Sequence, residues 1–337
     1  MGKPKDTDYL YSTARVRALE RFLLTREHME RMLEAKSDED ASKVLIECGY
    51  ENASITSVRQ LEELLSRERH CVYNLLLSFV PHRGVVDVFR IKYDYHNLKA
   101  IIKSEARRTD AGHLMIDSGR FDPSLLLGAV HKSDYSALTK RMRDAAVEAV
   151  DLLARTSDPQ LSDISLDKAC YAEMLEAAAE CKSDFLAAYV RLSIDAANLK
   201  TIVRSERTGR SSDFLRRALI EGGNIGIDRL TAFSSDMPLE KIFVRTPLER
   251  AASYGDELLS SSGGASLSDL DSLCDAALSA HLGKAHMVPF GEAPVIAYMA
   301  AKEEEYAAIR TILSGRLSGV PADYIRRRLP SASVVKV

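Results

Sequence analysis

The chain has 337 residues, and 46 Lys and Arg stand against 49 Asp and Glu, which gives a formal net charge of -3. This near balance offers no electrostatic argument for nucleic acid binding, which favours strongly basic surfaces. Hydrophobic residues make up 46% and charged residues 28%, an ordinary globular mixture that excludes a largely disordered chain. Only 17 Gly and 10 Pro are present, which argues against an all-β fold and for long helices.

Cysteine usage and hydropathy narrow the class further. The five cysteines are odd in number, and no CxxC pair occurs, so we expect reduced thiols in a cytoplasmic-type compartment. The N-terminal sequence lacks the apolar stretch of a signal peptide, and no run approaches the 18 apolar residues of a membrane span. We therefore expect no membrane-spanning helix.

Helical patterns follow one another along the chain. Near the N-terminus, Val16, Leu19, Phe22 and Leu23 are predicted to share an apolar face, with Arg15, Arg17, Glu20 and Arg21 mostly opposite. Start signals follow: the N-cap candidates Thr25, Ser37 and Ser57, the capping box TPLE at 246–249, and Pro294 and Pro321. The long predicted helices cover residues 58–79, 166–206 with a break near 182–184, and 295–314. Because strand signals are nearly absent, the sequence predicts an all-α fold.

An internal repeat is the strongest pattern. Residues 89–106 align without gaps on residues 190–207, and both copies contain D-x-x-N-L-K, at Asp94 to Lys99 and Asp195 to Lys200. A weaker third copy places Glu305, Ala308 and Arg310 where the first two have Asp, Asn and Lys. The linkers at 114–121 and 218–225 also resemble each other, and Gly319-Val320-Pro321 is expected to play their part after the third copy. The sequence therefore predicts three helical units, at 1–110, 111–212 and 213–337.

Two functions are open for the repeated motif. Asp94 and Asn97 are neighbours on one helix face, as are Asp195 and Asn198. In the first interpretation the motif packs a helix: Asn bonds to a neighbouring chain turn and Asp pairs with a base. In the second, the copies present equivalent polar contacts to a partner on a pseudo-threefold axis.

Sites for chemistry are not evident in the sequence. There is no P-loop, G-x-G-x-x-G, H-E-x-x-H or G-x-S-x-G motif, and the eight histidines are dispersed. The polar run Tyr93 to His96 has no second constellation to partner it in acid/base work. We therefore expect no catalytic residue, no cofactor and no metal, and no direct nucleotide binding.

Basic residues follow each copy of the repeat, and they too allow two interpretations. They could be solvated cations at helix C-termini, or a basic rim that faces acidic loops of a partner or anionic lipid headgroups. The residues are Lys103, Arg107, Arg108, Arg204, Arg207, Arg210, Arg316, Arg326, Arg327 and Arg328.

The combination of motifs resembles one family over essentially the whole chain. The opening YLYSTARVRALE at 9–20, the motif YDYHNLK at 93–99, PFGEAP at 289–294 and GVP at 319–321 are similar to the C subunit of archaeal and bacterial V-type (A-type) ATPases, a relative of the d subunit of the eukaryotic vacuolar enzyme. Two features depart from that resemblance: Ala308 replaces Asn, and residues 234–264 hold no motif that can be placed.

The resemblance implies three similar all-α domains around a pseudo-threefold axis, shaped like a funnel. It implies a non-catalytic central-stalk component on the cytoplasmic face of the membrane, a socket that couples the central shaft to the membrane rotor ring during proton or sodium transport. Expected partners are shaft and ring subunits, with peripheral contact to lipid headgroups also open.

Interface or scaffold positions are expected at a limited set of polar residues. These are Arg15, Arg17, Asp94, Asn97, Lys99, Asp195, Asn198, Lys200, Arg326, Arg327 and Arg328. Two other interpretations of the whole chain stay open: a generic helical scaffold that joins protein partners without a rotary role, and an all-α enzyme whose pocket the sequence does not reveal.

Overall fold

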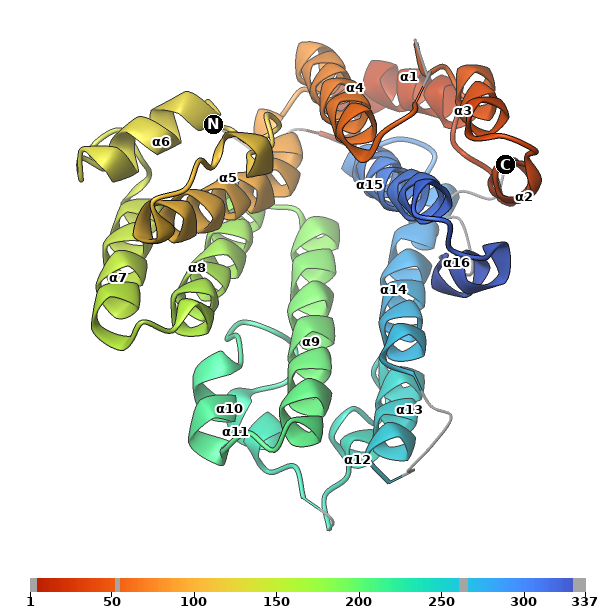
Figure 1. Cartoon of the computed structure of the whole chain (residues 1–337). Coiled ribbons are helices and arrows are strands. Elements are labelled where there is room, and N and C mark those ends of the chain that lie inside the picture. Colours follow the sequence, from red (N-terminus) through yellow and green to blue (C-terminus); the bar gives the residue numbers. More distant parts are fainter. Residues whose placement is uncertain (1–4, 52–54, 235, 261–265, 330–337) are drawn as a thin grey trace. The chain divides into compact units, whose positions relative to one another are not determined.

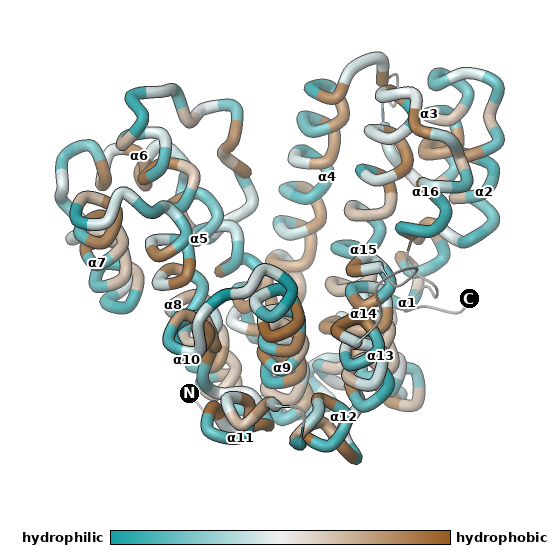
Figure 2. Tube along the Cα trace, turned by 60° about the horizontal axis from the view of Figure 1, so that its bottom comes forward, coloured by the Kyte–Doolittle hydropathy of each residue, from teal (hydrophilic) through white to brown (hydrophobic). Residues whose placement is uncertain are grey.

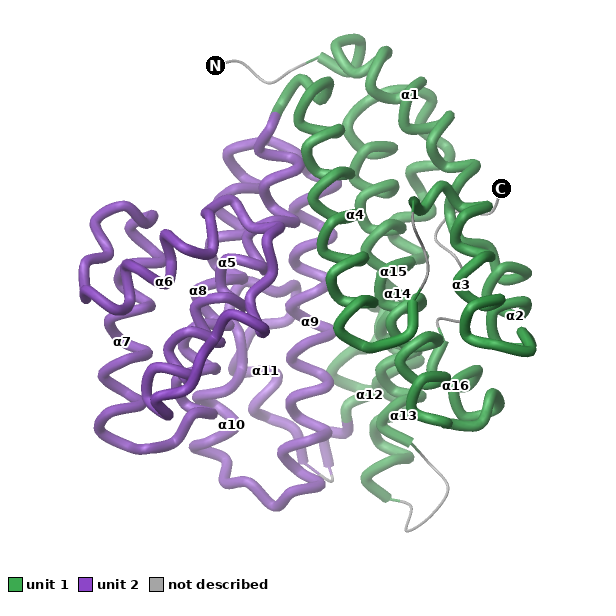
Figure 3. Tube along the Cα trace, turned by 45° about the horizontal axis from the view of Figure 1, so that its top comes forward, with its two compact units in different colours: residues 1–82, 239–337 green, residues 83–238 purple. Residues whose placement is uncertain are grey.

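The computed structural model describes residues 5–51, 55–234, 236–260 and 266–329, and within these ranges every regular element is a helix (Figure 1). The predicted all-α fold is thereby confirmed. The chain divides into two compact units, residues 1–82 with 239–337 (unit 1) and residues 83–238 (unit 2) (Figure 3). The predicted division into three similar helical domains, at 1–110, 111–212 and 213–337, stays a prediction.

Unit 2 is built around two long helices that carry the first two copies of the repeat. Its helices are α5 (Arg83–Arg107), α6 (Pro123–His131), α7 (Lys140–Thr156), α8 (Pro159–Glu180), α9 (Asp184–Arg207), α10 (Ser212–Ala218) and α11 (Ile227–Thr231), with a 3₁₀ turn at Gly112–Leu114. Helix α8 packs against α5, α7 and α9. The predicted break near 182–184 is confirmed, because Lys182 takes a left-handed φ of 54° and Ser183 caps α9.

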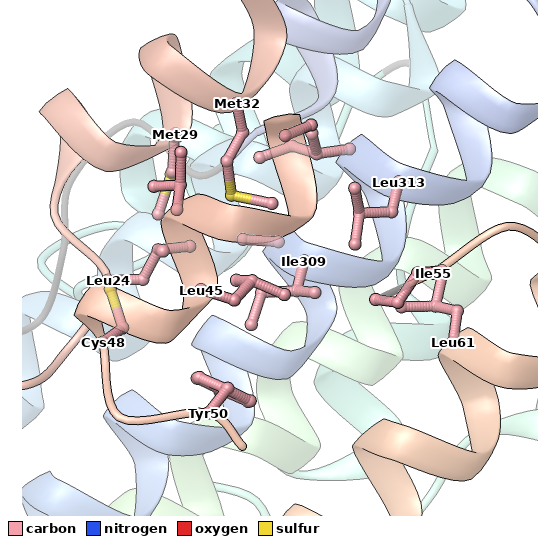
Figure 4. Close-up of a cluster of buried hydrophobic side chains, with 14 of the residues drawn as sticks. Leu24, Met29, Met32, Leu45, Cys48, Tyr50, Ile55, Leu61, Ile309 and Leu313 are labelled. Carbon is pink, nitrogen blue, oxygen red and sulfur yellow. The ribbon is translucent and has the colours of Figure 1, made fainter. Parts of the chain in front are cut away.

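Unit 1 surrounds α15, which carries the third copy. Its helices are α1 (Leu10–Glu20), α2 (Arg26–Glu34), α3 (Asp38–Glu47), α4 (Val58–Phe79), α12 (Leu239–Ile242), α13 (Glu249–Ser260), α14 (Leu267–Gly283), α15 (Glu292–Leu317) and α16 (Ala322–Arg328), with 3₁₀ turns at Asp6–Tyr9 and Lys284–Met287. Helix α15 contacts α1, α2, α3, α4, α14 and α16. Leu45, Ile309 and Leu313 belong to the apolar cluster where these helices meet (Figure 4).

The three predicted N-cap residues are confirmed. Thr25, Ser37 and Ser57 each accept a backbone N–H of the following first turn, as N-caps do. Helix α4 matches its predicted limits, and its hydrophobic positions recur at intervals of about a turn (Figure 2). The capping box at 246–249 is wrong: α13 begins only at Glu249, whose carboxylate accepts the N–H of Arg245 at 3.0 Å.

Candidate interaction surfaces

The two Asn residues of the repeat hold the loop that follows their own helix. Asn97 donates to the carbonyl of Ile116 at 2.9 Å and accepts the Ile116 N–H at 2.8 Å. Asn198 makes the same pair of bonds to Ile220, both at 2.8 Å. Both amides are buried. The first interpretation of the motif therefore describes what these Asn side chains do.

Asp94 also binds the loop that follows its helix, further along. Its carboxylate accepts the N–H groups of Arg120 at 2.8 Å and Phe121 at 3.2 Å, and Arg120 Nε at 2.7 Å. Arg120 reaches Glu173 on α8 at 2.9 Å as well. Burial raises the pKa of Asp94 above its ordinary value, although Arg120 opposes the rise. The first interpretation predicts that Asp94 pairs with a base, and the structure shows that this base is Arg120.

Asp195 repeats the arrangement without a base. Its two oxygens accept the N–H groups of Asn224 at 3.1 Å and Ile225 at 3.2 Å, and the side-chain amide of Asn224 at 2.8 Å. Burial raises the pKa of Asp195 too, with the Asn224 amide lowering it in part. The predicted pairing of Asp with a base is therefore wrong for the second copy, because an amide donor stands where Arg120 stands in the first.

In the third copy the acidic residue binds the N-terminal part of the chain and not a loop that follows its own helix. Glu305 on α15 accepts the N–H of Leu24 at 2.7 Å, and its other oxygen contacts Tyr50 and Lys302. Gly319 does take the left-handed φ of 70° expected of a helix cap. The expectation that a left-handed glycine and then an apolar residue follow the third copy is therefore confirmed, since Val320 comes next in the chain.

The motif cation joins the repeat helix to the helix packed against it. Lys99 on α5 is paired with Asp167 on α8. In the third copy, Arg310 on α15 forms two bonds of 2.6 Å to Glu62 on α4. Lys200, at the same position of α9, is half-buried and also has an interaction partner. Lys99 and Arg310 therefore each hold two helices together within their own unit.

Of the three C-terminal arginines, one is bonded to another helix and two are exposed. Arg326 Nε bonds to Glu30 on α2 at 2.9 Å, and this bond lowers the pKa of Glu30. Arg327 lies over the ring of Tyr324 at 5.9 Å, and both Arg327 and Arg328 are exposed. Arg326 therefore holds α16 against α2, and the role of Arg327 and Arg328 as interface positions stays a prediction.

Helix α1 is attached to unit 1 largely through polar groups. Ser12 donates to the carbonyl of Phe79 at 2.8 Å, and Thr13 exchanges bonds of 3.3 Å with Gly291. Arg17 binds Glu20 at 2.9 Å and the carbonyl of Ala285 at 2.9 Å. Ser12, Thr13 and Glu20 are all buried. Of the two N-terminal arginines singled out in the sequence, Arg17 belongs to this attachment.

The opposite side of α1 is apolar and faces outward. Leu10 is 51% exposed, Tyr11 64% and Phe22 41%, and Ala14 and Ala18 are exposed between them. The predicted faces of this helix are confirmed for the buried Val16 and Leu23, but they are wrong for the exposed Phe22 and the buried Glu20. Glu20 is buried because it is bonded to Arg17, and Phe22 lies beyond the end of the helix. Arg15 lies at the edge of this outer face, with its guanidinium 4.7 Å from the ring centroid of Phe79.

The polar run after Tyr93 is engaged within unit 2. Tyr95 donates to Glu173 at 2.7 Å, and His96 contacts the carbonyl of Leu114 at 3.1 Å. Burial, with Glu173 beside it, raises the pKa of Tyr95. Sequence reasoning missed Arg120 and Glu173; the glycine shared by both linkers, Gly119 and Gly223, was the available signal for a close approach there. In the described ranges no cluster of His, Cys, Asp or Glu could hold a metal ion.

No helix in the part of the chain that the structure describes combines the length and the apolar character needed to cross a bilayer.

Comparison with known families and sequences finds proteins similar to this chain. The model of the ATP synthase (C/AC39) subunit family matches residues 12–328. The chain is 23% identical to the C subunit of the V-type sodium ATPase of Enterococcus hirae, with 93% of this chain and 95% of that protein covered.

Two archaeal relatives agree. The chain is 26% identical to the C subunit of the A-type ATP synthase of Thermococcus kodakarensis, with 96% of this chain and 90% of that protein covered. It is 25% identical to the protein of the same name from Methanosarcina mazei, with 97% and 94% covered. The similarity extends along nearly the full length of the chain in each case. The match to the family model, at residues 12–328, includes all three copies of the repeat.

Proposed function

The chain belongs to the ATP synthase (C/AC39) subunit family, the non-catalytic C subunits of V-type and A-type ATPase complexes, and from that premise we propose that it is the central-stalk socket that couples the shaft to the membrane rotor ring. It would sit peripherally on the cytoplasmic face and pass rotation between ATP turnover in the head and proton or sodium movement through the ring. Family membership is the observation that carries the proposal.

The packing of the helices suits a part that transmits torque. Close-packed interiors resist compression, so a helical body can turn without absorbing the motion. Within unit 2, Lys99 and Lys103 on α5 are paired with Asp167 and Asp163 on α8. Within unit 1, Arg310 joins α15 to α4. Such cross-links between long helices oppose sliding of one helix along another.

The repeat supports a socket of three related parts. The Asp and Asn of the first two copies fasten the following loop in the same way, and Glu305 fastens Leu24 in the third. Three similar modules with boundaries near 110 and 212, arranged around a pseudo-threefold axis as a funnel, would enclose the foot of a shaft. Lipid headgroups would be met at most at the periphery.

Reconstitution with the neighbouring subunits tests the proposal. The chain is expressed with its ring and shaft subunits and purified in mild detergent. We expect one complex that contains all of them, and ATP hydrolysis that drives ion movement only when the chain is present. Failure of the chain to associate with either the ring or the shaft contradicts a socket role and favours a scaffold with other partners.

A further inference from the structure

Helix α1 places its polar and apolar residues unusually for a helix on a protein surface. Its buried side carries Ser12, Thr13 and Glu20 beside Val16. Its exposed side carries Tyr11, and the exposed Phe22 lies two residues beyond its end. A surface helix normally turns its apolar stripe to the core and its polar residues to water. Since the buried side is already bonded to unit 1, the exposed apolar side is left for something outside the unit.

A segment that contacts α1 also carries exposed apolar side chains. Arg17 bonds to the carbonyl of Ala285 and Thr13 to Gly291, so both ends of the segment 285–291 contact α1. Within that segment Met287 is 86% exposed and Phe290 is 36% exposed. Exposed large apolar residues that are grouped along one helix and its neighbour mark an interaction surface more clearly than single exposed residues do.

The charges on this outer face are of one sign. Arg15 lies over the ring of Phe79 at 4.7 Å, and Arg21 lies over the ring of Phe22 at 4.6 Å. No acidic residue lies on the outer side of α1 between residues 10 and 22, where Glu20 is buried and bound to Arg17. A guanidinium stacked on a ring keeps its N–H groups at the edge, where they can bind carboxylates.

The shape of the face favours a helix as the occupant. Ala14 and Ala18 are one turn apart at its centre, and the larger Tyr11 and Phe22 stand toward its two ends. Small residues at the centre let the axis of a second helix approach closely, with large side chains at either end of the contact. A helix that lies in a bilayer surface turns a polar face rich in Lys and Arg to water, whereas the polar side of α1, with Ser12 and Thr13, is buried and bonded to unit 1.

We propose that the outer face of α1 and the residues just after it, formed by Leu10, Tyr11, Ala14, Ala18 and Phe22, binds an amphipathic helix of another subunit of the assembly. That helix has an apolar stripe bordered by carboxylates, which pair with Arg15 and Arg21. This inference rests on the proposed function for the existence of the assembly, and it adds the surface and the chemistry of the partner.

A charge placed in the centre of the face tests the contact. Ala14→Glu puts a carboxylate between Tyr11 and Phe22, and Arg15→Glu reverses an edge charge. Ala276→Glu is the matched control, because Ala276 is an exposed alanine inside α14. We expect each α1 variant to lower the affinity of the chain for the rest of the complex by about tenfold or more, and the control to leave it unchanged.

The outcomes separate this inference from the proposed function. If the wild-type chain does not join the ring and shaft subunits, the proposed function fails. If the wild type joins and Ala14→Glu joins equally well, the function stands and the role of α1 is wrong. The thermal unfolding temperature of each isolated variant is the control for folding. If it equals that of the wild type, the substitution acts on binding and not on stability.

A cross-link identifies the occupant directly. Tyr11 is replaced by p-benzoylphenylalanine, and the purified complex is irradiated and digested. We expect a cross-linked peptide with apolar residues at helical spacing and Asp or Glu within one turn of the attachment site. Attachment to lipid, to a basic segment or to nothing contradicts the proposal. Vesicles of phosphatidylcholine and phosphatidylglycerol test a lipid surface as the occupant. If the isolated wild-type chain binds these vesicles and Ala14→Glu does not, the proposal is contradicted.

Discussion

Gly119 lies directly against the carboxylate of Asp94: a Cβ atom at position 119 would stand closer than 3.0 Å to Asp94 Oδ1. Gly223 has the same relation to Asp195 in the second copy. In both loops the next residue donates its N–H to that carboxylate. A residue without a side chain at this position lets the backbone come near enough for these bonds to form.

Substitution of either glycine by alanine should therefore destabilise unit 2. Gly119→Ala or Gly223→Ala forces the loop away from the buried carboxylate, and we expect the free energy of unfolding to fall by about 1–3 kcal/mol. Urea denaturation followed by circular dichroism measures this. The control is Gly128→Ala in α6, where a Cβ meets nothing within 4 Å; it should gain about 0.4–1 kcal/mol. Equal effects at positions 119 and 128 contradict the account.

Removal of either repeated Asn should be costly. Asn97→Ala leaves the N–H and carbonyl of Ile116 without their partner, and Asn198→Ala does the same to Ile220. A buried backbone group left unpaired costs about 1–3 kcal/mol of unfolding free energy. Asn74→Ala, at an exposed position of α4, is the control and should change stability by less than about 0.5 kcal/mol. A similar small change for Asn97→Ala argues that water replaces the amide.

Restoration of the motif in the third copy should not stabilise the chain. Ala308 is 1% exposed inside the apolar cluster of α15, so Ala308→Asn places an amide among apolar side chains. We expect a loss of about 1–3 kcal/mol. Ala307→Asn, at the exposed neighbouring position, should lose less than about 1 kcal/mol through helix propensity alone. A gain in stability at 308 shows that a loop partner exists there after all.

Two carboxylates should give opposite pH dependences. Burial raises the pKa of Asp195 in the folded state, so its contribution to stability is present at low pH and is lost as pH rises through the folded pKa. Bonds from Ser124 lower the pKa of Asp122, so its contribution is present above the unfolded value near 3.8 and is lost as pH falls.

Unfolding free energies of wild type, Asp195→Asn and Asp122→Asn between neutral pH and about pH 3 measure the two effects. As pH falls, we expect the unfolding free energy of the wild type to rise relative to that of Asp195→Asn. Over the same interval it should fall relative to that of Asp122→Asn. Parallel differences for both variants contradict the assignment, because they imply that burial does not dominate at Asp195.

The candidate sites were predictable where a pattern is local. The repeat drew attention to Asp94, Asn97 and Lys99, and all three have contacts within unit 2. Their partners were harder to predict. Arg120 is adjacent in sequence to a glycine that both linkers share, whereas Glu173 lies 78 residues from Tyr95 and carries no sequence signal. A motif reveals which side chains matter to a helix, but the other half of each contact lies elsewhere in the chain.

The sequence by itself determined that this protein is helical, where several of its helices begin, and that one motif recurs, because periodicity and capping depend on residues within a few positions of each other. The tertiary structure decided which face of α1 looks outward and which segment closes the third copy. Leu24 and Glu305 are 281 positions apart. Such a contact depends on how whole helices pack, and the same apolar stripe can be buried within the unit or left for a partner, so no local rule fixes it.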